Sequence, residues 1–345
     1  MIKITKNFKI SSDSEPKIIA EISGNHGGSK KRFLKLIKSA CLNGADLIKI
    51  QSYEPKDITL NKKKGKYLIK KGIWKNINLW DLYKKACTPL SWHDDAFNLA
   101  KKYKKIIFSS PFSLRAVDKL ERLNCKIYKI ASFEITDVKL IDYIASKNKP
   151  IIISTGMASN NEISKAINQI KKYHNKIIIL HCVSSYPTQL KDIKLHKIKE
   201  LRDKFKTNLI GLSDHTNGIT SSLISLAYGT VAIEKHFKID DKFKTADSSF
   251  SITPDQLKQL KLESSQVFES FKKKNSNSAE IISLGLRRSI FAKKKIAKNS
   301  KLTKDNIETL RPFIGICASE YFKVLGKKTK QNIKVGEPIF EKYLL

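Results

Sequence analysis

The sequence predicts an α/β protein, a (β/α)8 TIM barrel followed by a small C-terminal β-rich domain. Eight short runs rich in Val and Ile lie between residues 17 and 237, and amphipathic stretches with helical spacing separate them. Such apolar runs are typical of parallel strands buried on both faces. Eight alternating units favour a closed barrel over an open doubly wound sheet. No glycine-rich dinucleotide loop follows the first run, which further disfavours the open sheet.

The predicted strands, in chain order, are 17–23, 45–51, 105–112, 126–132, 150–156, 176–182, 208–214 and 231–237. One connection is unusually long, with roughly 27 residues between Gln51 and the predicted helix around Leu79. Loops of that length inside a compact domain are usually functional lids or disordered. Trp74, Trp80 and Trp92 fall in or just after it. We expect them to anchor this excursion by packing, with substrate contact as the alternative.

The chain divides into two predicted domains. The barrel ends with a last helix over 254–273, and a polar linker occupies 274–284. Residues 285–345 predict a compact β-rich domain with one helical turn at 303–310. It is too small to bury much core alone, so we expect it to dock on another surface.

Composition narrows the function classes. The net charge of +35 comes almost entirely from lysines spread along the chain, with no arginine-rich arm and no nucleic-acid-binding motif, so we expect no nucleic-acid partner. No apolar run approaches a membrane span, and the first ten residues lack a signal-peptide core, so we expect a cytoplasmic protein with no membrane partner. The five cysteines include no CxxC pair, which argues against a disulfide framework or a cysteine zinc site.

Polar residues collect at the carboxyl ends of the predicted strands, where TIM barrels carry their active sites. Those residues are Glu21, Lys49, Gln51, Ser110, Lys129, Ser132, Glu134, Ser154, Ser213, His215, Glu234 and His236. Lys49 and Lys129 are the most informative, because an unpaired ammonium in a barrel interior is costly. With serine hydroxyls beside them they suit a ligand bearing phosphate and carboxylate. Pairing with Glu21 or Glu134, snorkelling to the rim, and Schiff-base chemistry are the alternatives.

His215 and His236 end neighbouring predicted strands, so their imidazoles could converge on one metal ion. Two histidines with a carboxylate and open positions suit a labile divalent ion such as Mn²⁺ better than structural zinc. A hydrogen-bonded core histidine is the usual alternative for either residue alone.

Eight ordered motifs carry a resemblance to a known family. They are KIIAEISGNHGG, GADLIKIQSY, FSSPF, YKIASFE, STGMA, LHCVSSYPT, GLSDHT and EKHF. In this order they resemble the sialic acid synthase family, and TLRPFIG with NIKVGEPI resembles its antifreeze-like (SAF) domain. The resemblance implies condensation of phosphoenolpyruvate with an open-chain N-acetylated sugar, a divalent metal (Mn²⁺, Mg²⁺ or Co²⁺) and release of phosphate.

The resemblance also implies roles for particular residues. The positions that match phosphoenolpyruvate contacts are Lys49, Ser110, Lys129, Ser132, Ser154 and Ser213. His215 and His236 match the metal ligands, with Glu21 near them through water. Gln51, Tyr186, Asp247 and Arg311 match positions that hold the sugar, and Ser184 stands where N-acetylneuraminate synthases commonly have asparagine. We expect Glu134 and Glu21 to move protons, with Lys129 and Asp247 in the catalytic group.

Within the family, residues 72–93 resemble the pseudaminic acid synthases. This implies 2,4-diacetamido-2,4,6-trideoxy-L-altrose as the sugar, with N-acetylneuraminate and legionaminate synthases as close alternatives and a metal-dependent barrel aldolase as a distant one. The resemblance also implies a domain-swapped homodimer, in which Arg311 reaches the partner's barrel.

Overall fold

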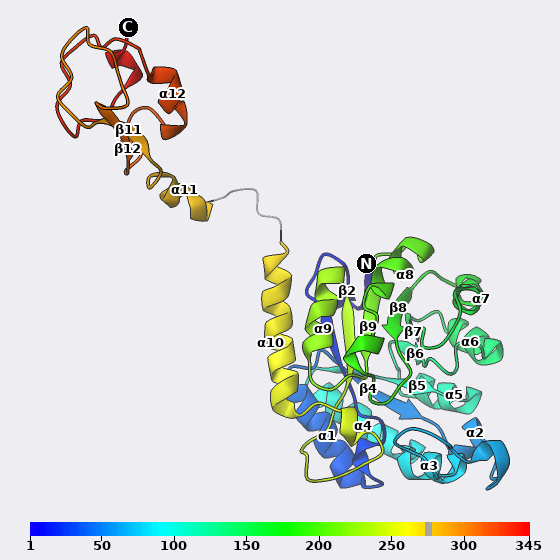
Figure 1. Cartoon of the computed structure of the whole chain (residues 1–345). Coiled ribbons are helices and arrows are strands. Elements are labelled where there is room, and N and C mark those ends of the chain that lie inside the picture. Colours follow the sequence, from blue (N-terminus) through cyan, green and yellow to red (C-terminus); the bar gives the residue numbers. More distant parts are fainter. Residues whose placement is uncertain (273–277) are drawn as a thin grey trace. The chain divides into compact units, whose positions relative to one another are not determined.

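The computed structural model describes residues 1–272 and 278–345. The chain forms two compact units, Met1–Phe271 and Lys272–Leu345 (Figure 1). Part of the predicted linker over 274–284 lies outside the described residues, and the helix α11 (Ser278–Leu284) occupies the remainder. Among the described residues, no helix is both long enough and apolar enough to cross a membrane.

The first unit contains a closed eight-stranded parallel barrel, which confirms the predicted fold class. Its strands pair in the order β10-β3-β4-β5-β6-β7-β8-β9. Their bounds are β3 Lys17–Glu21, β4 Leu47–Ser52, β5 Ile106–Pro111, β6 Tyr128–Ile130, β7 Ile151–Ser154, β8 Ile177–Cys182, β9 Ile210–Asp214 and β10 Ala232–His236. Each predicted run therefore contains or overlaps a strand, trimmed at the ends where the chain turns into a loop.

Helices surround the barrel (Figure 1). They are α1 Lys30–Leu42, α4 His93–Lys102, α5 Leu114–Arg122, α6 Val138–Ala145, α7 Asn160–Lys171, α8 Lys197–Phe205, α9 Thr220–Ser225 and α10 Pro254–Ser270. Helix α7 shows why these segments are helical. Ser159 and Glu162 form a reciprocal capping box at its start. Its buried residues Ile163, Ala166, Ile167 and Ile170 fall at spacings of three and four, so one face packs inward.

Isoleucines are the most frequent residues of the barrel strands, and at one position the packing is too close for any side chain. Gly211 lies on β9, where a Cβ atom would fall 2.4 Å from the Ala232 carbonyl oxygen and 2.5 Å from a Leu180 methyl carbon. Only a residue without a side chain fits there. Strands β9 and β10 can therefore approach each other closely just below the point where they carry functional side chains.

The long connection after β4, residues 55–86, contains helices and a bridge and is not an open loop; it is called the excursion below. It contains α2 (Pro55–Ile58), the 3-10 turn η2 (Gly65–Tyr67), a bridge between Leu68 and Asn78, and α3 (Leu79–Ala86).

An antiparallel hairpin at the N-terminus, β1 (Ile2–Thr5) with β2 (Phe8–Ile10), was not predicted. Its strands, of four and three residues, are too short to stand out from the polar residues around them.

The second unit has a small core of its own around Ile290, Ile307 and Ile333. Strand β11 (Ser289–Ala292) pairs with β12 (Ile307–Leu310), and a short helix, α12, spans Tyr321–Val324. The helical turn predicted at 303–310 is confirmed only at its start: the Ile307 amide donates to the Thr303 carbonyl oxygen at 3.2 Å, and β12 occupies the remaining residues. β-branched Ile307 and Thr309 pair with Ala292 and Ile290, and this pairing outweighs the local helical pattern.

Candidate active site

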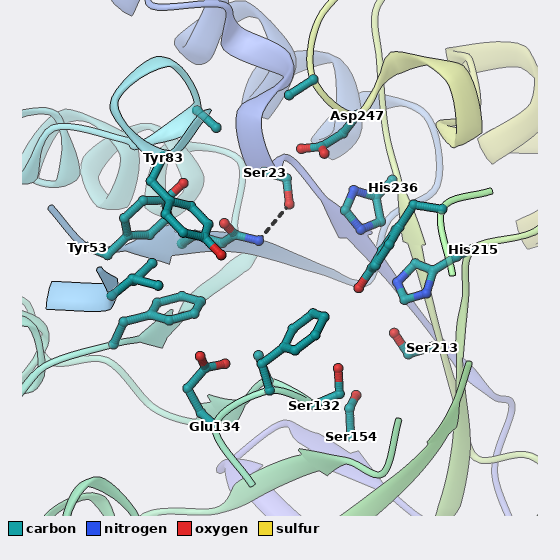
Figure 2. A pocket seen from close by; sticks show the side chains of 18 of the residues that line it. Ser23, Tyr53, Tyr83, Ser132, Glu134, Ser154, Ser213, His215, His236 and Asp247 are labelled. Atoms are coloured by element: carbon teal, nitrogen blue, oxygen red, sulfur yellow. Dashed lines mark hydrogen bonds between the residues drawn. The ribbon is translucent and has the colours of Figure 1, made fainter. Parts of the chain in front are cut away.

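A cavity of about 380 Å³ opens at the carboxyl ends of the barrel strands (Figure 2). The strands supply a polar part, and the excursion after β4 supplies much of an apolar part. The polar side chains that line it are Ser23, Lys49, Gln51, Lys129, Ser132, Glu134, Ser154, Ser213, His215, Glu234, His236 and Asp247. Figure 2 shows His215 and His236 on one side of the pocket, with Tyr53 and Tyr83 on the other.

The deepest charges form one ion-pair cluster. Lys49 Nζ lies 2.8 Å from Glu21 Oε2 and 3.4 Å from Glu234 Oε1. Lys129 Nζ lies 3.3 Å from the same Glu234 oxygen, which also accepts a 3.1 Å hydrogen bond from Ser213. Both lysine side chains are at most 4% exposed. Each buried ammonium therefore has a counter-charge, and Glu234 connects the two.

The cluster sets the ionisation of its members. Burial would raise the pKa of Glu234, but Lys129 and Lys49 lower it to about 2, so this carboxylate stays charged. Burial opposes charge on Lys49, yet Glu21 and Glu234 outweigh it and raise the Lys49 pKa. Burial raises the pKa of Glu21 and lowers that of Lys129. A negatively charged ligand would oppose this last shift, because it would stabilise the Lys129 ammonium.

Several buried polar atoms around the cavity have no hydrogen-bond partner among the described residues. They include the Ser110 and Ser154 hydroxyl oxygens, one oxygen each of Glu134 and Glu234, and His236 Nδ1. Native proteins satisfy nearly all of their buried polar groups. Such a group of free donors and acceptors in one place is typical of a ligand site.

His215 and His236 lie side by side, with ring centroids 5.3 Å apart and ring planes inclined by 61°. The Val183 carbonyl oxygen lies 3.0 Å from His215 Nδ1, so that nitrogen carries a proton and, in the neutral ring, Nε2 has the free lone pair. A metal-binding histidine usually donates its other ring N–H in this way, to a backbone carbonyl or a carboxylate. Within residues 1–272 and 278–345, no group of three or more His, Cys, Asp or Glu side chains is arranged to hold a metal ion. The two histidines thus fit an open site in which the protein supplies few ligands.

Two carboxyl groups are poised near neutral pH. Burial raises the pKa of Glu134 to about 7, with Asp137 adding to the effect and Lys129 and Lys49 opposing it. Burial also raises the pKa of Asp247 to about 6, although its Oδ2 accepts a 2.9 Å hydrogen bond from the Gly24 amide. Both groups can therefore gain or lose a proton near physiological pH, as acid–base residues must.

The apolar part of the cavity comes mainly from the excursion. Its side chains are Ile58, Ile69, Trp74, Leu79, Leu82, Tyr83 and Ala86, joined by Tyr53, Phe112 and Phe133 from the strand ends. Trp74 Nε1 donates to the Ala246 carbonyl oxygen at 3.1 Å, and its ring lies 5.4 Å from that of Tyr186. Trp74 therefore joins three loops at the cavity wall and lines the cavity as well. The sequence suggested packing and substrate contact as alternatives, and the position of Trp74 permits both.

Of the fifteen residues singled out from the sequence, eleven line this one cavity. They are Glu134, Lys129, Asp247, Lys49, Gln51, Ser132, Ser154, Tyr186, Ser213, His215 and His236. Glu21 lies directly behind the lining, bonded to Lys49 and, at 2.5 Å, to Ser23. Ser110 is buried on β5, and Ser184 shares a 2.8 Å hydrogen bond with Ser132. Arg311 is exposed in the second unit, on the loop after β12.

The sequence reasoning placed Glu234 at a strand end but did not include it among the site residues. The signal was present, because Glu234 stands two residues before His236 and must share its face of the strand. Ser23 was also missed. It receives a 2.9 Å hydrogen bond from Gln51 Nε2, the dashed line at Ser23 in Figure 2. It also donates to Glu21, so it connects two predicted residues. The pairing of Lys49 with Glu21 was foreseen only as an alternative to an anion site.

Comparison with known proteins agrees with this architecture. Residues 36–276 match the model of the NeuB family, and residues 287–344 match that of the SAF domain. A pseudaminic acid synthase of Helicobacter pylori is 38% identical over 94% of this chain and 96% of its own length. An N,N'-diacetyllegionaminic acid synthase of Campylobacter jejuni is 37% identical over 94% of this chain and 98% of its own length.

A solved structure is similar as well. The N-acetylneuraminic acid synthetase of Leptospira borgpetersenii superposes with a TM-score of 0.72 at 30% identity, covering 81% of this chain and 94% of that one. The family model spans more than half of the chain, and the relatives span nearly all of it. The chain therefore belongs to the NeuB family and is a synthase enzyme that carries a C-terminal SAF domain.

Proposed function

We propose that the enzyme condenses phosphoenolpyruvate and water with 2,4-diacetamido-2,4,6-trideoxy-L-altrose, giving pseudaminic acid and phosphate. The observation that carries this proposal is the division of one cavity into a cationic, hydroxyl-rich end and an apolar end. The first suits a small ligand with phosphate and carboxylate groups, and the second suits a sugar with a methyl group and two acetamido groups. The 38% identity to a pseudaminic acid synthase over most of the chain supports the same product.

Phosphoenolpyruvate would bind at the cationic end. Lys129 and Lys49 would supply the charge, and Ser132, Ser154 and Ser213 would supply hydroxyl donors along the strand ends. Ser110 has a buried hydroxyl without a partner among the described residues, and it fits the same anion. Because Glu234 already holds both lysines in place, little side-chain entropy would be lost when the anion binds.

The sugar would bind across the mouth, toward the excursion. Gln51, Tyr186 and Asp247 line the cavity there, and Ser184 would contribute through its bond to Ser132. His215 and His236 would hold a divalent ion, which when bound polarises the aldehyde oxygen as a Lewis acid. The enol carbon of phosphoenolpyruvate would then form the new bond to the aldehyde carbon, and Glu21 would exchange a proton with the resulting oxygen.

Water completes the reaction. It adds to the oxocarbenium carbon left by the condensation, and the tetrahedral intermediate expels phosphate by cleavage of its C–O bond. Glu134, whose pKa of about 7 suits a base at neutral pH, takes the proton from this water.

A legionaminate or N-acetylneuraminate synthase is the second candidate, since the legionaminate relative is 37% identical. These enzymes would share the anion end and differ at the apolar end.

The substrate is tested by phosphate release with a panel of sugars. We expect the highest kcat/KM with 2,4-diacetamido-2,4,6-trideoxy-L-altrose and a product of pseudaminic acid mass. Trp74→Ala should lower kcat/KM for this sugar by about 10-fold to 100-fold, because it removes aromatic contact area worth roughly 1.5–3 kcal/mol, while the KM for phosphoenolpyruvate changes little. A higher kcat/KM with N-acetylmannosamine would refute the product and leave the reaction class standing.

The metal is tested by its removal. Chelation should abolish turnover, and Mn²⁺, Mg²⁺ or Co²⁺ should restore it. His215→Ala and His236→Ala should each fold and lose both Mn²⁺ binding and turnover, because each removes one of two protein ligands. Full activity in metal-free buffer would contradict the metal site. The condensation itself would still stand, because phosphate release measures it directly.

The role of Glu134 is tested by a pH profile. Burial raises its pKa to about 7, so the basic form is lost as the pH falls below that value. We expect kcat/KM to drop about tenfold per pH unit below pH 6 and to level off above pH 8. Glu134→Gln should lower kcat by roughly 10² to 10⁴ and remove the titration step near 7. If that step persists in Glu134→Gln, another group is the base, and Asp247, with a pKa of about 6, is next to test.

We also propose that the active form is a domain-swapped homodimer in which Arg311 reaches the partner's sugar site. Arg311 is exposed and has Leu310, Phe313 and Ile314 around it, each more than 40% exposed. An exposed apolar patch with one central arginine is typical of a surface that another protein covers. A cover over the barrel mouth would keep bulk water from the reactive intermediate.

The dimer is tested by mixing two inactive variants, Arg311→Ala and His215→Ala. After subunit exchange, half of the dimers are mixed and each holds one intact composite site, so we expect about a quarter of wild-type activity. Exchange is verified by mass spectrometry of differently tagged chains. Verified exchange without recovered activity would show that Arg311 acts within its own chain or not at all.

A further inference from the structure

A second buried ion pair lies in the barrel wall behind the two histidines. Lys235 Nζ is 3.0 Å from Asp214 Oδ2, and neither side chain has any exposed surface. Along β10, Glu234 and His236 line the cavity, so the intervening Lys235 points to the opposite face, toward the helices. Neither Lys235 nor Asp214 belongs to the cavity lining, and the proposed reaction uses neither.

The pair is the centre of a closed network. Asp214 Oδ1 accepts hydrogen bonds from the Thr216 amide and the Thr216 hydroxyl, both at 2.8 Å. Asp214 Oδ2 accepts one from the Ser222 hydroxyl of α9 at 2.6 Å. Lys235 Nζ donates to the Thr216 carbonyl oxygen at 2.5 Å. Asp214 and Lys235 therefore fix Thr216, the residue after His215, through its amide, its hydroxyl and its carbonyl group.

The network also connects the two strands that carry the histidines. Lys235 and Asp214 are register partners in the β9–β10 ladder. Asp214 directly precedes His215, and Lys235 directly precedes His236. A change in the Asp214–Lys235 spacing would therefore change the distance and angle between the two imidazoles.

Stability alone does not account for such a pair. Well-packed apolar residues of similar volume often replace a buried ion pair without loss of stability, because the pair must first give up its hydration. Apolar residues cannot replace the directional hydrogen bonds of the pair. Four donors fix the Asp214 carboxylate in one orientation. Functional side chains work only when held within about 0.5 Å of their productive geometry.

We propose that Asp214 and Lys235 are positioning residues, which set the spacing of His215 and His236 for metal binding. The proposal rests on the metal site of the proposed function. Substituting the pair should leave the fold intact and weaken metal binding, because the two imidazoles would no longer keep their present spacing and inclination. The residues touch neither substrate nor metal, so their effect reaches the site through the backbone of β9 and β10.

The test is Mn²⁺ binding to the metal-free full-length protein, measured by calorimetry. The main variant is Asp214→Asn combined with Lys235→Met, which removes both charges and leaves none unpaired. We expect Mn²⁺ to bind about 10-fold to 100-fold more weakly than to wild type, the range usual for losing a supporting partner of a metal ligand. Thr216→Val, which keeps the side-chain shape and removes one donor to Asp214, should weaken binding severalfold.

The matched control is Ser109→Ala. Ser109 Oγ lies 2.6 Å from Ser52 Oγ and 3.0 Å from the Ile50 carbonyl oxygen, in a buried network between β4 and β5. This substitution should lower the unfolding midpoint and leave Mn²⁺ affinity unchanged. It thereby separates general loss of packing from loss of histidine geometry.

Each outcome decides between the proposals. Wild-type affinity in both folded variants would overturn the positioning role and leave the metal site standing. Should the double variant fail to fold, wild-type affinity in Thr216→Val alone would overturn it. An equal loss of affinity in Ser109→Ala would also overturn it, since any weakened barrel would then show the effect. If wild-type protein itself does not bind Mn²⁺, the metal site and the positioning role are both refuted.

Discussion

The structure depends on one constraint: two lysine ammonium groups line the cavity of a barrel whose strands are mostly apolar. Neither charge could be buried there alone. Glu234 connects both lysines, and Glu21 neutralises Lys49 a second time. The same carboxylates account for the raised pKa of Lys49, while burial accounts for those of Glu134 and Asp247. Burial and ion pairing together therefore set the charges of the cavity.

The fold could be predicted because its signal is repeated eight times. Each strand is a short apolar run, and a shift of one residue in any run would bring an isoleucine into the cavity and a polar residue into the wall. The strand ends could be predicted for the same reason, and eleven of the fifteen residues named from the sequence share one cavity. Topology alone brings residues as distant as Lys49 and Glu234 together.

What the sequence could not give is the pairing of those residues. Lys49 and Glu21 lie on neighbouring strands, but spacing does not say which carboxylate a lysine selects, and Glu234 was not ranked above the other polar strand ends. The helical turn predicted at 303–310 ends early, at β12, for a related reason. Ile307 and Thr309 are paired by a strand nearly twenty residues away, and a local pattern contains no information about that partner.

The excursion after β4 has a consequence for how enzymes of this architecture diverge. It is a continuous piece of chain that begins and ends beside the cavity, and the barrel closes without it. The strand ends carry the charged groups of the cavity, while residues 55–86 supply much of its apolar lining. Insertions and exchanges in that one segment can therefore change substrate choice without a matching change in the catalytic strands. The charged and the apolar parts of the cavity can therefore change almost independently of each other.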